Sequence, residues 1–246
     1  MSLESGGEAG ERVLLVGAGG IGSPAALALL GAGVRRFRVV DDDRIDVTNL
    51  HRQILFRDAD VGAPKLEAFA NAVRRRAPEA SIETIEGRFR PDTASTLLAG
   101  AAVVIDATDN FASRFLIADA CALARVPVVH AAAIRWRATV LTASSAGRPC
   151  YRCLFEDLPE GFAPDCATAG VAGPVCGVAG AVAADRAVRI LAGDTSVFGR
   201  VVTFDGIRDR LRELPLAPRP DCPLCGDSRS IADLNPNRYQ TQVCFQ

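Results

Sequence analysis

The sequence predicts an α/β fold: a Rossmann-like, doubly wound and mainly parallel sheet that continues into antiparallel strands. Three observations carry this prediction. Apolar runs alternate with helical patterns through about residue 133, which is typical of a parallel sheet covered on both faces. A glycine-rich turn, "GAGGIGSP", directly follows the first apolar run, as in nucleotide-binding folds of this class. Beyond residue 133 strand-like segments follow without helices of the earlier kind.

The elements of the first part follow from local pattern. Continuous apolar runs such as 12–17 indicate buried strands, and apolar residues at helical spacing indicate helices. The segment 43–62 has no clean periodicity, and we predict a functional loop because a structureless connection of this length is uncommon. Expected strands are 12–17, 37–41, 81–86, 102–109 and 126–133, and expected helices are 23–34, 64–76, 92–100 and 110–125.

The second part has a different texture. Segments 137–144 and 200–206 read as strands, which we expect to extend the sheet in antiparallel fashion. Between them, 156–174 is rich in Gly, Pro and Ala and is predicted to be a loop, and 175–193 forms a helix of small apolar residues.

Composition excludes several classes of protein. The chain has 246 residues, 49% of them hydrophobic and 23% charged, as expected of a globular domain with a sizeable core. The formal net charge of −1 gives no sign of a surface for nucleic acid or acidic membrane. No signal peptide and no apolar run long enough to span a membrane is present in the sequence, so a cytoplasmic protein is expected.

The glycine-rich turn predicts a nucleotide site. Gly17, Gly19 and Gly22 match the pattern G-x-G-x-x-G between a strand and a helix, with Gly20 inside it. Such a turn brings backbone amides and a helix N-terminus toward phosphate oxygens. Asp41, 24 positions after Gly17 at the end of the second strand, is placed to accept hydrogen bonds from an adenosine ribose. These features indicate an adenine nucleotide, and a nicotinamide or flavin oxidoreductase stays an alternative.

Cationic residues downstream favour a triphosphate. Lys65 is the only lysine among 28 basic residues and stands at the start of a predicted helix, and "NLHRQ" presents Asn49, Arg52 and Gln53. A triphosphate attacked at phosphorus releases a polyanion, which needs added positive charge. The alternative is that Arg52 and Lys65 are solvated surface residues.

Acidic residues end the fourth predicted strand, in "DATDN". The carboxyl ends of parallel strands surround the ligand crevice, and Asp109 offers the oxygen ligands that Mg²⁺ prefers. Asp106, Asp109 or Asn110 could instead cap the following helix, and for Asp106 we expect this structural role.

Two Cys-x-x-Cys pairs predict a zinc site. Cys150 and Cys153 are separated by 68 residues from Cys222 and Cys225. Four thiolates complete a tetrahedral Zn²⁺ and leave no open position, so the site would be structural. Free thiols or redox-active pairs are the alternatives. Cys166 stands apart in the Gly/Ala-rich loop, where it is either a small buried residue or an accessible thiol suited to acyl transfer.

The motifs "GAGGIGS", "DDD", "NLHRQ", "VGAPK", "ATDN", "PCYRCL", "CATAGVAGP" and "CPLCG" occur in this order. With them the chain resembles the MoeB/ThiF/HesA family of ubiquitin-activating-type adenylyltransferases. The resemblance implies an adenylation domain over 12–235 with zinc knuckles at 150–153 and 222–225. The flanking segments, 1–11 and 236–246, are then a disordered tail and a C-terminal tail.

The resemblance also implies an activity. Members of the family use Mg·ATP to convert the C-terminal Gly-Gly carboxylate of a small ubiquitin-like sulfur-carrier protein into an acyl-adenylate, with release of pyrophosphate, and are typically homodimers. It implies catalytic roles for Arg52, Lys65 and Asp109, with Cys166 as a thiol that could take up the activated carrier. The implied nucleotide-binding residues are Gly17, Gly19, Gly20, Gly22, Asp41, Asp43, Asn49, Arg52, Gln53, Lys65, Asp109 and Asn110.

In two respects the sequence departs from relatives of this type. The N-terminal "RYxRQ" segment, whose arginine reaches the partner subunit's ATP, is missing from the sequence, and so is a rhodanese domain after the second zinc knuckle. We therefore expect a separate sulfur donor protein. The missing arginine keeps open a third reading beside enzyme and oxidoreductase: a catalytically impaired, dimeric scaffold that binds the carrier.

Overall fold

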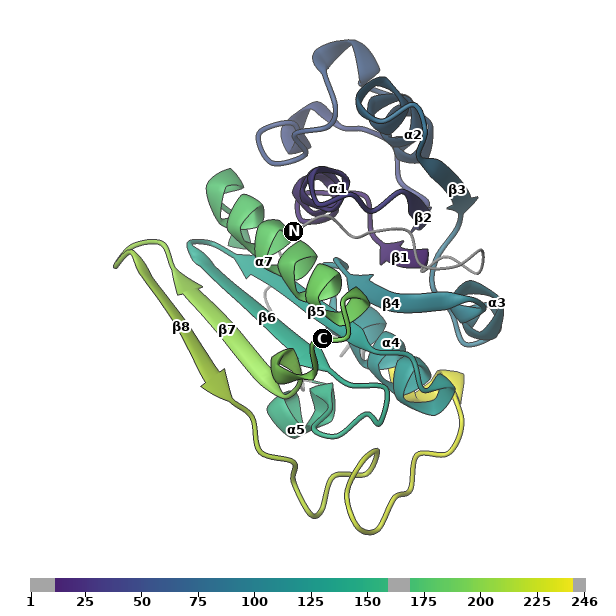
Figure 1. The fold of residues 1–246 in the computed structure, drawn as a ribbon, viewed down its shortest axis with the longest axis vertical. Helices are drawn as coiled ribbons and strands as arrows, with labels where there is room; N and C mark the ends of the chain where they lie inside the picture. Colours follow the sequence, from purple (N-terminus) through teal and green to yellow (C-terminus); the bar gives the residue numbers. More distant parts are fainter. Residues whose placement is uncertain (1–11, 159–168, 241–246) are drawn as a thin grey trace, which may run out of the picture.

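The computed structural model describes residues 12–158 and 169–240. In this part of the chain eight strands form one sheet in the order β3-β2-β1-β4-β5-β6-β7-β8 (Figure 1). The strands are β1 Arg12–Val16, β2 Arg36–Asp41, β3 Ser81–Glu86, β4 Ala101–Asp106, β5 Val128–Ile134, β6 Arg137–Ala143, β7 Arg200–Asp205 and β8 Arg210–Pro215. The helices are α1 Gly22–Gly31, α2 Lys65–Arg76, α3 Ala94–Leu98, α4 Phe111–Ala124, α5 Tyr151–Phe155 and α7 Gly173–Leu191.

The sheet changes character at β5. Strands β1 to β5 pair in parallel, and β6, β7 and β8 continue the sheet in antiparallel fashion. This confirms the mixed α/β fold expected from the sequence. The strand order reverses between β1 and β4, where Val16 pairs with Asp106. In folds of this kind the ligand crevice opens at the carboxyl ends of the strands beside such a reversal.

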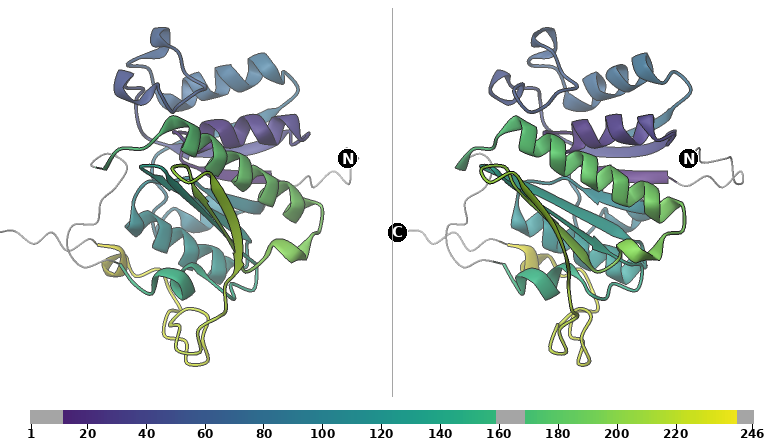
Figure 2. Two further views of the ribbon diagram at one scale, coloured as in Figure 1. Left: turned by 90° about the vertical axis from the view of Figure 1, so that its left-hand side faces the viewer. Right: turned by 60° about the vertical axis from the view of Figure 1, so that its left-hand side comes forward.

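Helices cover both faces of the sheet, and each face has its own apolar core. One core joins buried residues of α1, α2 and α7 to the strands, and the other joins those of α3 and α4. Figure 2 shows α7 and α4 on opposite faces. Helix α7 crosses the start of α1 very closely: a Cβ atom at Gly180 would lie 2.6 Å from the carbonyl oxygen of Ile21. The small residues of α7 thus permit a contact that a larger side chain would prevent.

Several elements were not expected from the sequence. Strand β8 escaped prediction because all six of its residues are exposed and give no buried alternation. The one-and-a-half turns of α5 follow Cys150 directly. The long connection 43–62 contains only the short 3₁₀ turns η1 (Val47–Asn49) and η2 (Asp58–Asp60), in line with the predicted loop.

The C-terminal end of the described chain is held against α4. The expected tail 1–11, part of the expected loop 156–174 and the last residues lie outside the described ranges. Two further 3₁₀ turns, η3 (Thr195–Val197) and η4 (Pro236–Tyr239), are present. Turn η4 is held by a hydrogen bond of 2.9 Å from the Tyr239 hydroxyl to Asp119 in α4. Among the described helices, none has the length and hydropathy that crossing a bilayer requires.

Candidate active site

A cavity of about 320 Å³ opens at the carboxyl ends of β1, β2 and β4. Its volume is in the range of small-molecule sites. It brings together ten of the twelve predicted nucleotide-binding residues: Gly17, Gly19, Gly20, Asp41, Asp43, Arg52, Gln53, Lys65, Asp109 and Asn110. The two others, Gly22 and Asn49, do not line it.

The glycine-rich turn forms the floor of this cavity. Gly17 has φ +97°, and a Cβ atom there would lie 2.9 Å from the Ala107 carbonyl oxygen. A Cβ at Gly22 would lie only 2.0 Å from the carbonyl oxygen of Gly17, so the turn has no room for a side chain at this position. The amides of Gly19 and Gly20 donate to no described residue. They stand just before α1, where free amides and the helix dipole favour an anion.

Two aspartates and the lone lysine form the side wall. The Asp41 carboxylate accepts hydrogen bonds from the amides of Ala18 (2.8 Å) and Asp43 (2.9 Å). Lys65 Nζ lies 2.6 Å from Asp43 Oδ2 and 3.9 Å from Asp41 Oδ1. Burial raises the pKa of Asp41, against the opposing effects of the Lys65 charge and the two amides.

The position of Lys65 follows from the start of α2. Pro64 precedes the helix, and the Lys65 amide donates to the Asp43 carbonyl oxygen at 3.0 Å. The side chain is therefore turned inward and is only 6% exposed. The alternative of a solvated surface lysine is wrong.

The loop between β2 and α2 supplies a second cation. The aliphatic part of Arg52 lies on the glycine turn, 3.1 Å from where a Cβ of Gly20 would be. Arg52 forms no side-chain hydrogen bond or ion pair with any described residue. Gln53 beside it is buried, and its Oε1 has no partner in the described chain. The carbonyl oxygen of Asn49 accepts hydrogen bonds from the amides of Arg52 and Gln53.

The loop after β4 forms the opposite wall. Asn110 caps α4 by accepting a hydrogen bond from the Ser113 amide at 2.9 Å. The expected cap, Asp106, is therefore wrong: this carboxylate accepts instead from the amide and hydroxyl of Thr108, at 3.0 and 2.6 Å. A backbone turn of two residues suits the short Asp side chain better than the more distant helix start. Asp109, next to Asn110, is exposed in the cavity.

A buried histidine lies behind this loop. His130 in β5 is 3% exposed, and its Nδ1 lies 2.7 Å from Asp106 Oδ2. Burial by itself would raise the pKa of Asp106, but the hydrogen bond and charge of His130, together with Arg114, bring it below its usual value. Sequence reasoning gave neither His130 nor Arg114 a role.

An apolar corner of the cavity was also missed. It contains Phe89, which follows β3 and is 5% exposed, together with Val16 and Val40 at the ends of two other strands. The signal was available, since residues after any parallel strand of the sheet reach the same edge. These three residues give one part of the cavity lining an apolar character, as is common in small-molecule sites.

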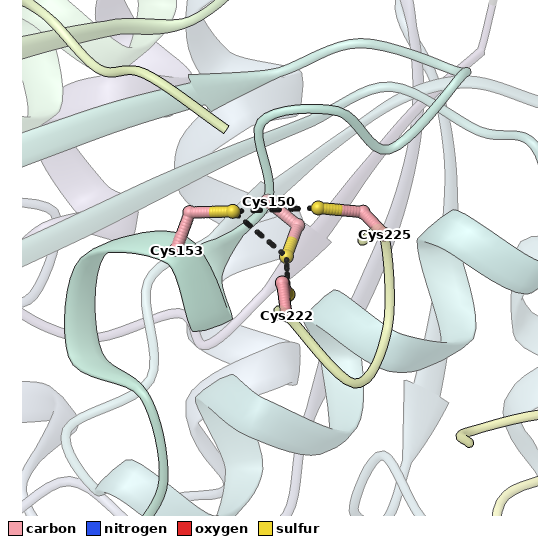
Figure 3. Close-up of side chains that lie close together, drawn as sticks. All are labelled: Cys150, Cys153, Cys222 and Cys225. Carbon is pink, nitrogen blue, oxygen red and sulfur yellow. Dashed lines mark hydrogen bonds between the residues drawn. The ribbon is translucent and has the colours of Figure 1, made fainter. Parts of the chain in front are cut away.

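The four predicted metal ligands lie close together (Figure 3). Their sulfur atoms all lie within 4.8 Å of one another, with separations of 3.9 Å for Cys150–Cys153, 3.5 Å for Cys150–Cys222 and 3.3 Å for Cys153–Cys225. A tetrahedral zinc–thiolate site with bonds of about 2.3 Å requires separations of about 3.8 Å. The geometry therefore fits zinc.

The chemistry of the donor set points the same way. Hydrogen bonding with Cys225 raises the pKa of Cys150, and the same bond lowers that of Cys225 to about 5. One thiolate is thus stabilised by its neighbours' protons, whereas four thiolates in contact require a cation. The cluster is closed, since each of the four cysteines is at most 7% exposed. It brings the start of α5 together with residues 222–225.

Of the remaining predicted residues, Cys166 lies outside the described part of the chain. Cys176, in the first turns of α7, lines the cavity instead, with Sγ 3.3 Å from where a Cβ of Gly20 would be. Its position could not be read from the sequence, because it depends on how α7 crosses α1.

The chain matches the ThiF family over residues 9–224. It belongs to this family. The SAMP-activating enzyme E1 of Haloferax volcanii is 40% identical over 91% of this chain and 84% of its own length. The sulfur carrier protein ThiS adenylyltransferase of Escherichia coli is 36% identical over 89% of this chain and 87% of its own.

One further relative is larger. The adenylyltransferase and sulfurtransferase MOCS3 of Anopheles gambiae is 39% identical over 90% of this chain, which spans about half (51%) of that protein. Among solved structures, E. coli MccB superimposes with a TM-score of 0.78 at 22% identity, over 90% of this chain and 67% of that one. At this identity the likeness concerns the fold.

Proposed function

We propose that this protein is an ATP-dependent adenylyltransferase that activates the C-terminal Gly-Gly carboxylate of a small ubiquitin-like sulfur-carrier protein. In this reaction a carboxylate oxygen of the carrier attacks the α-phosphorus of ATP. The bond from that phosphorus to the bridging oxygen breaks, and pyrophosphate leaves with its electron pair. The products are an acyl-adenylate and pyrophosphate.

The observation that carries the proposal is the pair of cations at the glycine turn. Arg52 lies on Gly20 without a partner among the described residues, and Lys65 is buried in the same cavity. A dinucleotide's pyrophosphate needs little beyond backbone amides, whereas a triphosphate that releases a polyanion needs such charges. The names of curated relatives, an E1 and a ThiS adenylyltransferase, support the same reaction.

Each wall of the cavity then has a task. Asp41 would accept hydrogen bonds from the ribose, and the apolar corner at Phe89 would hold the adenine. Arg52 and Lys65 would bind phosphate oxygens, with Lys65 shared between phosphate and Asp43. Asp109 would hold Mg²⁺, whose charge offsets that of the phosphates when it is bound. Gly17, Gly19, Gly20, Asp43, Gln53 and Asn110 complete the proposed nucleotide site.

The partners follow from this reaction. We propose a homodimer that binds the carrier and receives sulfur from a separate donor protein, with Cys166 as a candidate acyl-accepting thiol. Zinc in the Cys150, Cys153, Cys222 and Cys225 cluster has a structural task, because the site leaves no position open for a substrate.

ATP–pyrophosphate exchange tests the proposal. Exchange should depend on a small carrier protein ending in Gly-Gly, and Lys65→Ala should lower its rate by about one to two orders of magnitude, as for lost charge at a phosphate. Arg74→Ala, in the same helix but exposed and away from the cavity, is the matched control and should leave the rate unchanged.

Two results would contradict the proposal. Exchange that survives Lys65→Ala unchanged removes that lysine from the machinery. Binding of NADH, followed by its fluorescence, in a protein that does not bind ATP would favour the oxidoreductase instead.

A further inference from the structure

The starting point is a carboxylate that joins the cavity wall to the next strand. Asp106, at the end of β4, is fully buried. One of its oxygens accepts both hydrogen bonds from Thr108, and the other faces His130 Nδ1 at 2.7 Å. An ionised carboxylate can only accept hydrogen bonds, so Nδ1 carries the proton and donates it.

Thr108 is held from two sides. Its amide and hydroxyl donate to Asp106, and its carbonyl oxygen accepts from the guanidinium of Arg114. Asp109, the next residue, has no such anchor among the described residues: its side chain is exposed and accepts only a long 3.5 Å hydrogen bond from the Asn110 side chain. The place of the Asp109 carboxylate is therefore set by the backbone at Thr108.

Among these hydrogen-bonded residues, His130 is the one that lies away from the cavity. It sits on β5, packs against the ring of Tyr151 at a centroid distance of 4.7 Å, and is not among the lining residues. Its Nε2 is buried without a partner among the described residues. A buried nitrogen left unpaired costs free energy, so an apolar side chain would serve packing better. What this histidine supplies is the hydrogen bond from Nδ1.

We propose that His130 is a positioning residue for the metal side of the nucleotide site: its Nδ1–H orients Asp106, which fixes Thr108 and so places Asp109 for Mg²⁺. The inference rests on the proposed function, because that function makes Asp109 the magnesium ligand. Without the Nδ1 donor, one buried oxygen of Asp106 is unpaired, and the carboxylate must turn or take up a proton. Either change releases Thr108.

The test measures ATP binding as a function of Mg²⁺. Calorimetric titration of the full chain with ATP gives the affinity in EDTA and the Mg²⁺ concentration that produces half of the full affinity. Outer-shell partners of a metal site typically contribute about 10–100-fold to metal affinity. For His130→Leu we expect a half-saturating Mg²⁺ concentration raised about tenfold, with ATP affinity in EDTA unchanged.

A matched pair of variants separates positioning from packing. His130→Asn keeps an N–H donor near the position of Nδ1 and should retain wild-type Mg²⁺ dependence. His130→Gln places its amide nearer to Nε2 and should behave like His130→Leu. These two polar variants keep the test decisive if His130→Leu does not fold. Equal behaviour of Asn and Gln, or an equal loss of ATP affinity in EDTA and in Mg²⁺, overturns the inference.

Asp109→Asn distinguishes this inference from the proposed function. If it leaves Mg²⁺ dependence unchanged, the assignment of Asp109 in the proposed function fails, and the inference fails with it. If Asp109→Asn raises the Mg²⁺ requirement and the His130 variants do not, only the inference fails. Support requires that adding His130→Leu to Asp109→Asn causes no further change, as expected of residues that act as one unit.

Discussion

The nucleotide cavity and the cysteine cluster differ in how completely their polar groups are satisfied. In the cavity, several polar groups have no partner among the described residues: the Arg52 side chain, Gln53 Oε1 and the amides of Gly19 and Gly20. In the cluster, every sulfur contacts another and each cysteine is at most 7% exposed. A site that exchanges ligands must leave groups unpaired until the ligand arrives, whereas a structural site is closed. The comparison distinguishes an open ligand-binding cavity from a closed cysteine cluster.

Disrupting the cysteine cluster should have the largest effect. Cys222→Ser removes one thiolate, so bound zinc should fall from about one ion per chain to none, with a large drop in melting temperature. Elemental analysis and thermal denaturation measure the two. Cys121→Ala, at a buried cysteine outside the cluster, is the control and should keep the metal. A Cys222→Ser protein that retains its full zinc would refute the assignment.

The second largest effect is expected beside the cluster. Asp119 accepts two hydrogen bonds from Arg152, at 2.9 and 3.0 Å, and both side chains are almost fully buried. Asp119→Ala leaves the buried Arg152 guanidinium with only the exposed carboxylate of Asp157 at 3.3 Å, and should lower the free energy of unfolding by about 3 kcal/mol. Urea denaturation measures it. Replacing both partners, as Asp119→Leu with Arg152→Met, should cost much less; an equal loss would contradict the explanation.

In the nucleotide cavity, the expected effect of a substitution is a lower affinity for ATP. Asp41→Ala removes the acceptor for Ala18 and the proposed ribose contact, so ATP affinity should fall by about one to two orders of magnitude, as for lost hydrogen bonds to a charged group. Calorimetric titration with Mg·ATP measures it. The matched control is Asp92→Ala, whose exposed ion pair with Arg90 lies outside the cavity lining and should contribute little. Equal losses in both variants would argue against a specific role for Asp41.

The smallest expected effect concerns acid. The pKa of Asp106 lies below its ordinary value of 3.8 in the folded protein, so its ionised form stabilises the fold at higher pH, and this contribution is lost as pH falls below about 4. Asp106→Asn should therefore lose less unfolding free energy between about pH 5 and pH 3 than the wild type. Urea denaturation at the two pH values decides, and parallel losses in both proteins would show that Asp106 does not contribute.

Much of the fold could be predicted because it rests on local pattern. The buried parallel strands that contain Leu14 and Val104 are continuous apolar runs in the sequence. The spacing of the glycines in the turn after β1 predicts the geometry of that turn. Strand β8 could not be found, since Leu211 and Leu214 remain exposed and its partners come from β7 alone. An exposed edge strand leaves little mark on hydropathy.

The candidate site divides in the same way. Seven of the ten predicted lining residues stand after strand ends or in the glycine turn, where sequence position dictates proximity. The other three, Arg52, Gln53 and Lys65, were predicted from their polar or charged side chains in the long loop and at the start of α2. Asn49 does not line the cavity, and the backbone contacts of its carbonyl oxygen with the Arg52 and Gln53 amides could not be read from its residue type. His130 and Phe89 were missed because their neighbours lie on other strands.

By itself, the sequence determined the class of fold, the turn for a nucleotide and four cysteines in two knuckles. Each depends on spacing within a few residues, which fixes local geometry directly. Only the tertiary structure decided that the knuckles meet, that Lys65 faces Asp43 while Arg52 has no ion-pair partner among the described residues, and that Asp106 joins Thr108 to His130. These contacts join residues far apart in the chain, and the order of strands in the sheet brings them together.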